Sequence, residues 1–160
     1  MAEKPVQVSQ LDLAQLALFV GMAANERVLA RLHDRGFAGL RTSHGFIVQH
    51  LLREPHSVGK LASLLGISQQ AVSKSVAELV RLGYVEDAPS EDRRVRMLKL
   101  SRRGRAAVRA ARTSRLELET ELARLASEEA IDHTRRVLLL ALDALGSTGT
   151  IRARRVRPHT

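Results

Sequence analysis

Residues 57–85 limit the possible folds most, because this segment holds two helix starts and one helix stop at close spacing. The segment reads SVGKLASLLGISQQAVSKSVAELVRLGYV. Ser57 can cap a short helix, and Gly66 suits the left-handed position that follows a helix end. Ser68 can then cap a second helix after a tight turn. The apolar positions that this second helix would bury are Val72, Val76, Leu79 and Val80. The segment therefore predicts a helix, a turn and a helix.

The opposite face of the second helix carries other residues at spacings of three and four. These residues are Gln70, Ser73, Lys74, Ala77 and Arg81. Residues 68–77 contain no acidic side chain, which favours an anionic partner. A helix-turn-helix with a glycine before the turn is typical of DNA-binding domains, although the same arrangement also occurs in all-α proteins that bind no DNA.

The next segment, residues 90–104, reads SEDRRVRMLKLSRRG and predicts a β-hairpin with a charged tip. With a period of two, Leu98 and Leu100 share one side with Arg96 and can carry the core. Residues 83–86 supply the partner strand, and residues 88–92 are turn material. We expect Asp92 to form an ion pair with an arginine of the hairpin. Helix-turn-helix and hairpin together predict a winged helix-turn-helix.

Two phrases, KLASLLGISQQAVSKSVAELVRLGYVED and DRRVRMLKLSRRG, resemble the helix-turn-helix and the wing signature of the MarR family of bacterial transcriptional regulators. The positions of the wing signature are filled by Asp92, Arg94, Leu98, Leu100, Ser101 and Gly104. In the order of elements, the resemblance extends over residues 11–145. It implies an obligate dimer of winged helix-turn-helix lobes joined through N- and C-terminal helices. It also implies a small phenolic or lipophilic ligand that, in many members, releases DNA.

The parts outside the winged helix predict dimerisation helices. Residues 11–24 are apolar on every face, and Ser9 is the expected cap of their helix. A helix of about 25 residues should continue from Ser101, and residues 137–142 of the last helix are again apolar all round. A terminal helix of a small domain cannot bury every face within its own chain, so we expect one intermolecular core. The alternative is a monomer that encloses its last helix.

The expected fold is mainly α with a small β-hairpin wing, a winged helix-turn-helix with N- and C-terminal dimerisation helices. The expected division is an N-terminal dimerisation helix in residues 1–35, a DNA-binding domain in 40–104, C-terminal dimerisation helices in 105–146 and a disordered basic tail in 147–160. The tail carries four arginines and no acid. We interpret it as a solvated end rather than as an arm that grips DNA.

The expected DNA contacts follow from how winged helices dock. Recognition helices read bases with their N-terminal turns, and a Gln can pair bidentately with adenine. The candidates for base contacts are Gln69, Gln70, Ser73 and Lys74. Helix N-termini present free N–H groups to phosphates, where the candidates are Ser57, Lys60 and Ser68. Minor-groove contacts from the wing are expected from Arg93, Arg94 and Arg96. The alternative for each position is an ordinary solvated side chain.

The histidines give a weaker signal. In the family, an acidic aromatic ligand often lies in the cleft between the first two helices and the long helix, and His33, Arg41 and His44 are the candidates to line it here. The alternative is that they are satisfied surface or boundary groups. His44 and His50 lie six positions apart, which does not place two ligands on one helix face. We therefore expect no metal and no cofactor.

Composition narrows the function. Lys and Arg number 26 against 17 Asp and Glu, and the net charge of +9 favours an anionic partner such as nucleic acid. The chain has no Cys, no glycine-rich phosphate loop and no G-x-S-x-G motif, so we expect no enzyme. No targeting segment is visible, and no apolar run approaches the roughly 18 residues that span a bilayer. We therefore expect a cytoplasmic protein without a membrane partner.

The expected function is that of a sequence-specific transcriptional regulator, a repressor that binds a pseudo-palindromic operator as a homodimer. Its expected partners are double-stranded DNA, a second copy of the chain and a small aromatic or phenolic ligand that releases DNA. The alternative is a nucleoid-type or structural winged-helix protein that binds DNA without a ligand response.

Overall fold

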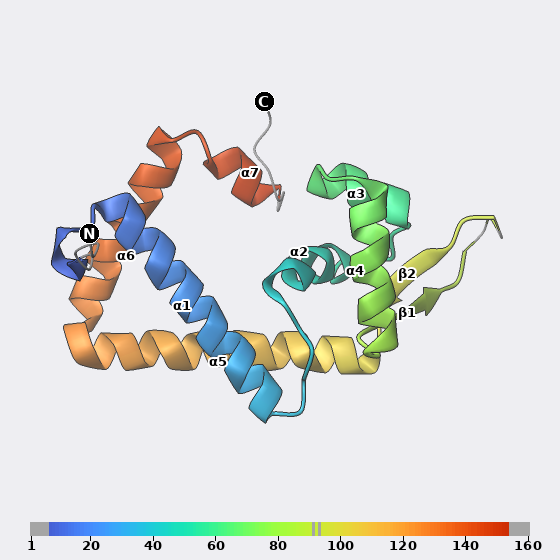
Figure 1. Ribbon diagram of the computed structural model, residues 1–160, viewed down its shortest axis with the longest axis horizontal. Coiled ribbons are helices and arrows are strands. Elements are labelled where there is room, and N and C mark those ends of the chain that lie inside the picture. Colours follow the sequence, from blue (N-terminus) through green and yellow to red (C-terminus); the bar gives the residue numbers. More distant parts are fainter. Residues whose placement is uncertain (1–6, 91, 93, 154–160) are drawn as a thin grey trace, which may run out of the picture.

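The structure is a computed structural model that describes residues 7–90, 92 and 94–153. This described part is mostly helical, with one small hairpin (Figure 1). Its elements are η1 (Val8–Gln10), α1 (Leu13–Asp34), α2 (Thr42–Leu51), α3 (Val58–Leu65), α4 (Gln69–Arg81), β1 (Val85–Ala88), β2 (Met97–Leu100), α5 (Arg102–Ala126), α6 (Glu128–Ala144) and α7 (Thr148–Arg152). Helices with a single antiparallel hairpin confirm the expected fold class.

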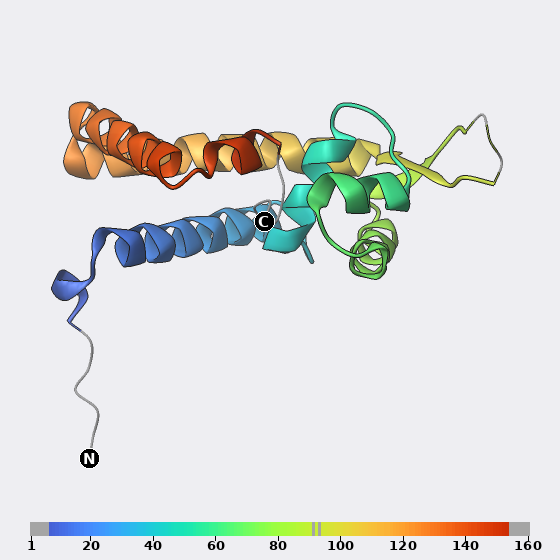
Figure 2. The same ribbon diagram turned by 90° about the horizontal axis from the view of Figure 1, so that it is seen from above.

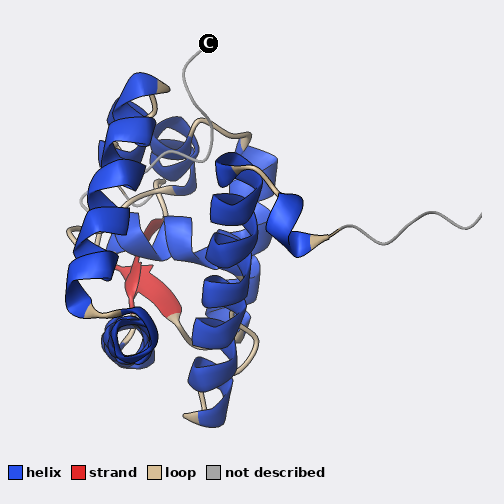
Figure 3. Cartoon of the chain, turned by 90° about the vertical axis from the view of Figure 1, so that its left-hand side faces the viewer, coloured by secondary structure: helices blue, strands red, loops and turns tan. Residues whose placement is uncertain are grey.

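The core lies in a lobe formed by α2, α3, α4 and the hairpin at one end of α5 (Figure 1). Side chains that are at most 2% exposed include Ile47, Leu51, Leu61, Leu65, Val72, Val76, Leu79, Leu98 and Leu100. The long helix α5 extends from this lobe to the opposite side of the molecule, where it meets α6. Figure 3 looks along α5 and shows the two strands behind the helices, and Figures 1 and 2 show that the hairpin projects outward from the lobe.

The helix-turn-helix forms where its capping signals predict it. The Oγ atom of Ser57 accepts the backbone N–H of Lys60 at 3.2 Å, which caps α3. Gly66 ends α3 at φ 69°, in the left-handed region that favours glycine. The Oγ atom of Ser68 accepts the N–H of Ala71 at 3.2 Å and caps α4. These three local signals, all readable from the sequence, are confirmed.

The hairpin pairs β1 with β2 in antiparallel register, from Val85 opposite Leu100 to Ala88 opposite Met97. Leu98 and Leu100 are buried, as the period-two pattern predicts. The other edge of β2 forms a bridge to the loop between α2 and α3, because His56 and Leu98 exchange both backbone hydrogen bonds at 3.0 Å. The wing is therefore attached to the helix-turn-helix by backbone as well as by core packing.

Ser101 and Gly104 join the wing to α5. The Ser101 hydroxyl donates to the carbonyl oxygen of Gly83 at 2.6 Å, and its Oγ accepts the N–H of Gly104 at 3.0 Å. A Cβ atom on Gly104 would lie 2.1 Å from the carbonyl oxygen of Tyr84, so the close contact between α5 and the hairpin requires glycine. The hydroxyl of Tyr84 donates to the carbonyl of Ala38 at 2.8 Å. The last two positions of the wing signature thus have structural roles.

The start of α1 differs from the prediction. Asp12, not Ser9, is the N-cap, because its carboxylate accepts the N–H of Gln15 at 2.8 Å while its own N–H donates to the Gln15 side chain. Ser9 lies within the short helix η1. A reciprocal capping box satisfies two free N–H groups at once, which favours Asp12 over a single serine cap. α1 then lies against α5 and buries Val28 and Leu32 (Figures 1 and 2).

The C-terminal helices follow the predicted order, with one correction. α5 has 25 residues and is capped by Ser101, and Ser127 caps α6. The tail expected to be disordered begins instead with a short helix, α7, because the turn at Gly146 (φ 66°) allows the chain to reverse. Residues 154–160 lie outside the described residues.

α1 also passes a length and composition test for a membrane span, with 22 residues and a mean hydropathy of 1.2 in its most apolar window. Only 6% of that window is buried in this chain. The expectation that no apolar segment approaches spanning length is therefore wrong for α1. One such helix is weak evidence of a span, since the core helix of a soluble protein and a signal sequence near an N-terminus pass the same test.

Candidate nucleic-acid interface and adjoining cavity

The helix α4 has one buried face and one exposed face. Val72, Val76 and Leu79 are at most 2% exposed and fix the helix in the core. The side chains expected to contact bases all lie on the exposed face, and they are Gln69, Gln70, Ser73 and Lys74. In the first turns of α4 there is no acid, so this face offers amide, hydroxyl and ammonium groups to a partner.

The N-termini of α3 and α4 lie together. A Cβ atom on Gly59 would lie 3.3 Å from the Nε2 atom of Gln69, which shows how near the two first turns are. Lys60 is exposed, whereas Ser57 and Ser68 use their side-chain oxygens to cap α3 and α4. Two helix N-termini with a lysine beside them form a surface suited to phosphates.

The wing carries exposed arginines, and within its described residues one of them forms an ion pair across the strands. Arg96 pairs with Asp87 across the hairpin, with Nε 2.6 Å from Oδ1. Asp92 accepts the backbone N–H of Arg94 at 2.9 Å and orders the turn. The Arg94 side chain is exposed. Arg93 lies outside the described residues. The ion pair expected between Asp92 and an arginine of the hairpin stays a prediction, because Arg93 is outside the described residues.

A cavity of about 100 Å³ lies between α1, α2 and α5. Its apolar wall includes Val28, Leu32 and Val108, and its polar rim includes Arg41 and His44. His33, the third candidate, is exposed and does not line this cavity. Two arginines that sequence reasoning missed, Arg112 and Arg115, do line it. Their spacing of three on a long helix was a signal that could have placed both on one face.

His44 connects the rim of this cavity to α4. The imidazole is 1% exposed, and its Nδ1 accepts the backbone N–H of Arg41 at 3.3 Å. Its Nε2 lies 3.3 Å from Oε2 of Glu78 on α4. Burial and, second, the nearby charge of Arg41 lower the pKa of His44 from its ordinary value of 6.5. The ring is therefore neutral near pH 7, with Nε2–H donating to Glu78.

The guanidinium of Arg41 forms an ion pair with the same carboxylate oxygen of Glu78. Glu78 is the one acidic residue of α4. Two residues of the cavity rim thus hold one carboxylate of the helix that carries the candidate base contacts. We name Arg41, His44 and Glu78 the Glu78 clasp.

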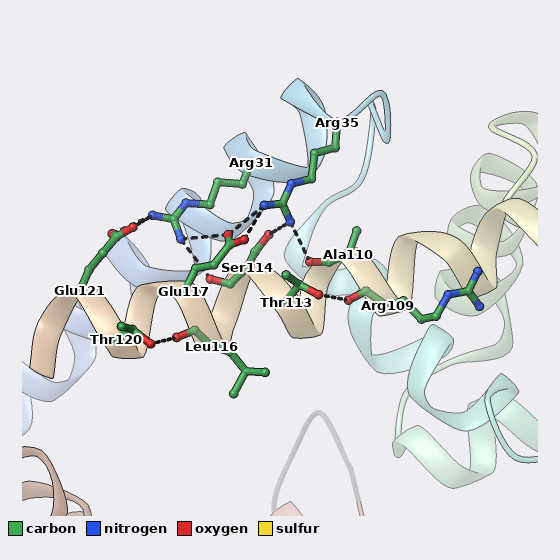
Figure 4. A network of polar contacts seen from close by, with 10 residues as sticks. All are labelled: Arg31, Arg35, Arg109, Ala110, Thr113, Ser114, Leu116, Glu117, Thr120 and Glu121. Carbon is green, nitrogen blue, oxygen red and sulfur yellow. Dashed lines mark hydrogen bonds and ion pairs between the residues drawn. The ribbon is translucent and has the colours of Figure 1, made fainter. Parts of the chain in front are cut away.

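A second polar network joins α1 to α5 (Figure 4). Arg31 donates through Nη2 to both carboxylate oxygens of Glu121, at 2.6 and 2.7 Å. Arg35 donates to both oxygens of Glu117 at 2.8 Å and to the hydroxyl of the buried Ser114 at 3.0 Å. In each pair one guanidinium nitrogen, Nη2, contacts both carboxylate oxygens, and these charge-assisted bonds tie α1 to α5. No local pattern predicts these contacts, because the partners lie more than 70 positions apart in the chain.

An extensive apolar surface is exposed on α1 and α6. No residue of α6 is buried within this chain. The exposed side chains of α1 include Leu13, Leu18, Phe19, Val20 and Met22, each at least 52% exposed. On α6 and just after it they include Leu139, Leu140 and Leu145, each at least 58% exposed. An apolar groove of about 550 Å³ runs between α1, α5 and α6.

Among the residues that the structure describes, no group of three His, Asp or Glu side chains is placed to hold a metal ion. His50 and His56 meet edge to face, with ring centroids 6.5 Å apart. 

The two caps, the exposed face of α4 and the attached hairpin define a winged helix-turn-helix protein. Residues 38–94, which run from the start of the lobe into the wing, match the model of the MarR family. No curated protein sequence gives a match. The resemblance to the MarR family that the sequence indicates is thus confirmed over the helix-turn-helix and part of the wing.

Several solved structures share the fold, MarR from E. coli among them. RV1404 from Mycobacterium tuberculosis has a TM-score of 0.66 at 20% identity, over 91% of this chain and 97% of that one. Apo wild-type MarR from E. coli has a TM-score of 0.62 at 18% identity, over 82% and 98%. A mutant of S. aureus MepR bound to an oligodeoxyribonucleotide has a TM-score of 0.60 at 18% identity, over 85% and 99%. The chain therefore has a MarR-type winged-helix fold along most of its length.

Proposed function

We propose that this protein is a sequence-specific DNA-binding transcriptional regulator of MarR type. The observation that carries the proposal is the exposed face of α4, which is acid-free over its first turns and is held rigidly by a buried opposite face. A helix of this kind fits the major groove, and Gln69 and Gln70 can each bond an adenine edge. We call α4 the recognition helix from here on.

The wing supports the same partner. Arg94 is exposed at the tip of the hairpin, beyond the strands that pair with the core. An arginine in that position can enter a minor groove, where narrow walls concentrate negative potential. Lys60 and the N-termini of α3 and α4 would meet phosphates on the same face of the lobe.

We further propose that two copies assemble through α1 and α6. The apolar surface of these helices continues into the groove between α1, α5 and α6, a shape that accepts helices of a second copy. A lipid surface would explain the apolar face of α1 but not a groove that continues onto α6. Two recognition helices related by a two-fold axis would read a pseudo-palindrome with half-site centres about 10 bp apart, or a small multiple of that.

The lining of the cavity between α1, α2 and α5 favours the binding of a small ligand. Apolar walls with Arg41, Arg112 and Arg115 at the rim suit a small aromatic anion, as a phenolic or carboxylic acid would be. The Glu78 clasp couples this ligand to DNA binding. An anion that draws Arg41 away from Glu78 removes one of the two polar contacts that the clasp makes to the recognition helix.

Repression is the simplest consequence, since a dimer seated on a promoter blocks polymerase by occupancy. The other candidate is a nucleoid-type winged-helix protein without sequence preference. The acid-free, Gln-rich start of α4 favours the regulator, because phosphate binding alone requires no amide side chains.

Selection of bound duplexes from a random DNA pool tests the proposal. The account predicts recovery of an inverted repeat, bound more tightly than random duplex by a factor of about 10³ or more at fixed salt. Enrichment of no sequence, with tight binding to all duplexes, would support the nucleoid-type protein instead.

A further inference from the structure

A groove of about 380 Å³ lies where α2, α3 and α7 meet, on a side of the lobe separate from the cavity described above. Arg53 lines it from the end of α2, Lys60 from the first turn of α3 and Arg152 from α7. Figure 1 shows how α7 turns back from α6 toward α3. Two neighbouring segments of the lobe and one helix about 90 positions further along the chain thus contribute one cation each.

The charge of this groove is unbalanced. Within the residues that the structure describes, the side chains of Arg53, Lys60 and Arg152 form no ion pair. Glu54 also lines the groove, but its side chain is 70% exposed and its carboxylate lies 3.7 Å from Nε2 of His56. Three uncompensated cations around one groove attract an anion.

The groove borders the proposed DNA-binding face. Lys60 belongs to the first turn of α3, where Ser57 caps the helix and the remaining free N–H groups add partial positive charge. The same turn approaches Gln69 of the recognition helix through Gly59. A DNA strand bound along the recognition helix would therefore pass close to this groove.

We propose that the groove binds DNA phosphates and that α7 is a third DNA-contacting element, beside the recognition helix and the wing. This inference rests on the proposed function. Three cations spread along a groove can contact several phosphates of one strand. A single small anion needs only a pair of donors, so it would leave part of this charge unused. The chain after Arg152 carries three further arginines and no acid, which favours the same partner.

The test compares Arg152→Ala with Arg124→Ala, an exposed arginine near the end of α5 that does not line the groove. Both full-length variants and the wild type are titrated on a random duplex by fluorescence anisotropy, from about 50 to about 200 mM KCl. We expect Arg152→Ala to weaken binding several-fold at the lowest salt and to reduce the salt slope by about 0.9 per protomer. Arg124→Ala should match the wild type. Arg53→Ala, a second groove variant at a residue that the proposed function does not use, should repeat the effect of Arg152→Ala.

Further measurements separate the possible failures. If Arg152→Ala binds like the wild type while Lys74→Ala weakens binding, the groove is not a DNA contact and the proposed function stands. If the wild type itself binds no duplex, both proposals fail together. Inorganic phosphate provides the last arm, with its direct binding measured by calorimetry at constant ionic strength. If phosphate binds the wild type but not Arg152→Ala, and this variant keeps its duplex affinity, the groove is a small-anion site and the DNA proposal is overturned.

Discussion

The imidazole Nε2 of His44 lies 3.3 Å from Oε2 of Glu78, so a fully buried side chain of α2 meets the one acidic residue of the recognition helix. Nδ1 of the same ring accepts the N–H of Arg41, which leaves Nε2 as the donor. The recognition helix is therefore held by a polar link as well as by its apolar face. This link begins at the rim of the cavity between α1, α2 and α5.

Removing the carboxylate should destabilise the fold. Glu78→Ala leaves the buried N–H of His44 without its partner and Arg41 without its counter-ion, at a cost of about 1–3 kcal/mol in the free energy of unfolding. Urea unfolding measures the difference. Glu86→Ala is the matched control, because Glu86 pairs with Lys99 on the exposed side of the hairpin and its loss should cost less than about 0.5 kcal/mol. Equal losses for the two variants would contradict the role of the clasp.

Acid should destabilise the fold through His44, because a proton on Nδ1 charges a buried ring and removes the acceptor of the Arg41 N–H. The pKa of His44 is below 6.5 in the folded chain and returns to about 6.5 on unfolding. Below that pH the unfolded chain binds more protons, so this contribution to stability is complete above pH 6.5 and is lost as the pH falls. From about pH 8 to about pH 5, the wild type should lose more free energy of unfolding than His44→Gln does. His133→Gln, on exposed α6, should behave like the wild type, and the account fails if His44→Gln does so too.

The apolar surface of α6 predicts a variant that separates dimer from fold. Leu139→Glu places a charge where the second copy is expected to pack, so a micromolar sample should sediment as a monomer and lose specific DNA binding. Val95→Glu changes an equally apolar but distant residue of the hairpin and should leave the sedimentation coefficient unchanged. A wild type that already sediments as a monomer would refute the dimer.

The cavity predicts a response to a small aromatic anion. Benzoate at millimolar concentration should weaken DNA binding by the wild type, whereas the neutral benzyl alcohol should not, because the arginines at the rim favour a carboxylate. Arg115→Ala should reduce the effect of benzoate without touching the Glu78 clasp. If benzoate and other aromatic acids leave operator affinity unchanged, a constitutive repressor without a ligand is the better description.

Much of the fold was predictable because its signals are local. Ser57, Gly66 and Ser68 each fix a helix end through neighbours within four positions, and Leu98 and Leu100 follow a two-residue period. The predictions failed at two places where more than one local structure was compatible with the sequence. Asp12 with Gln15 replaced Ser9 as a cap, and α7 replaced the start of the expected disordered tail.

The site was less predictable, because its key contacts join distant parts of the chain. His44 and Glu78 are 34 positions apart, and Arg31 and Glu121 are 90 apart. No period or motif connects such pairs. His33, Arg41 and His44 looked equivalent in the sequence, yet the structure places the first in solvent and the other two at the cavity rim.

The most direct test of the central claim measures what the recognition helix reads. Wild type, Gln70→Ala and Arg94→Ala are titrated on the selected operator and on random duplex at several salt concentrations. The account predicts that Gln70→Ala loses about 1–3 kcal/mol on the operator and little on random DNA, with the salt slope unchanged. Arg94→Ala should weaken both duplexes and reduce the slope by about one counterion per protomer. If Gln70→Ala keeps the full preference for the operator over random duplex, the exposed face of α4 does not read sequence, and the central claim is wrong.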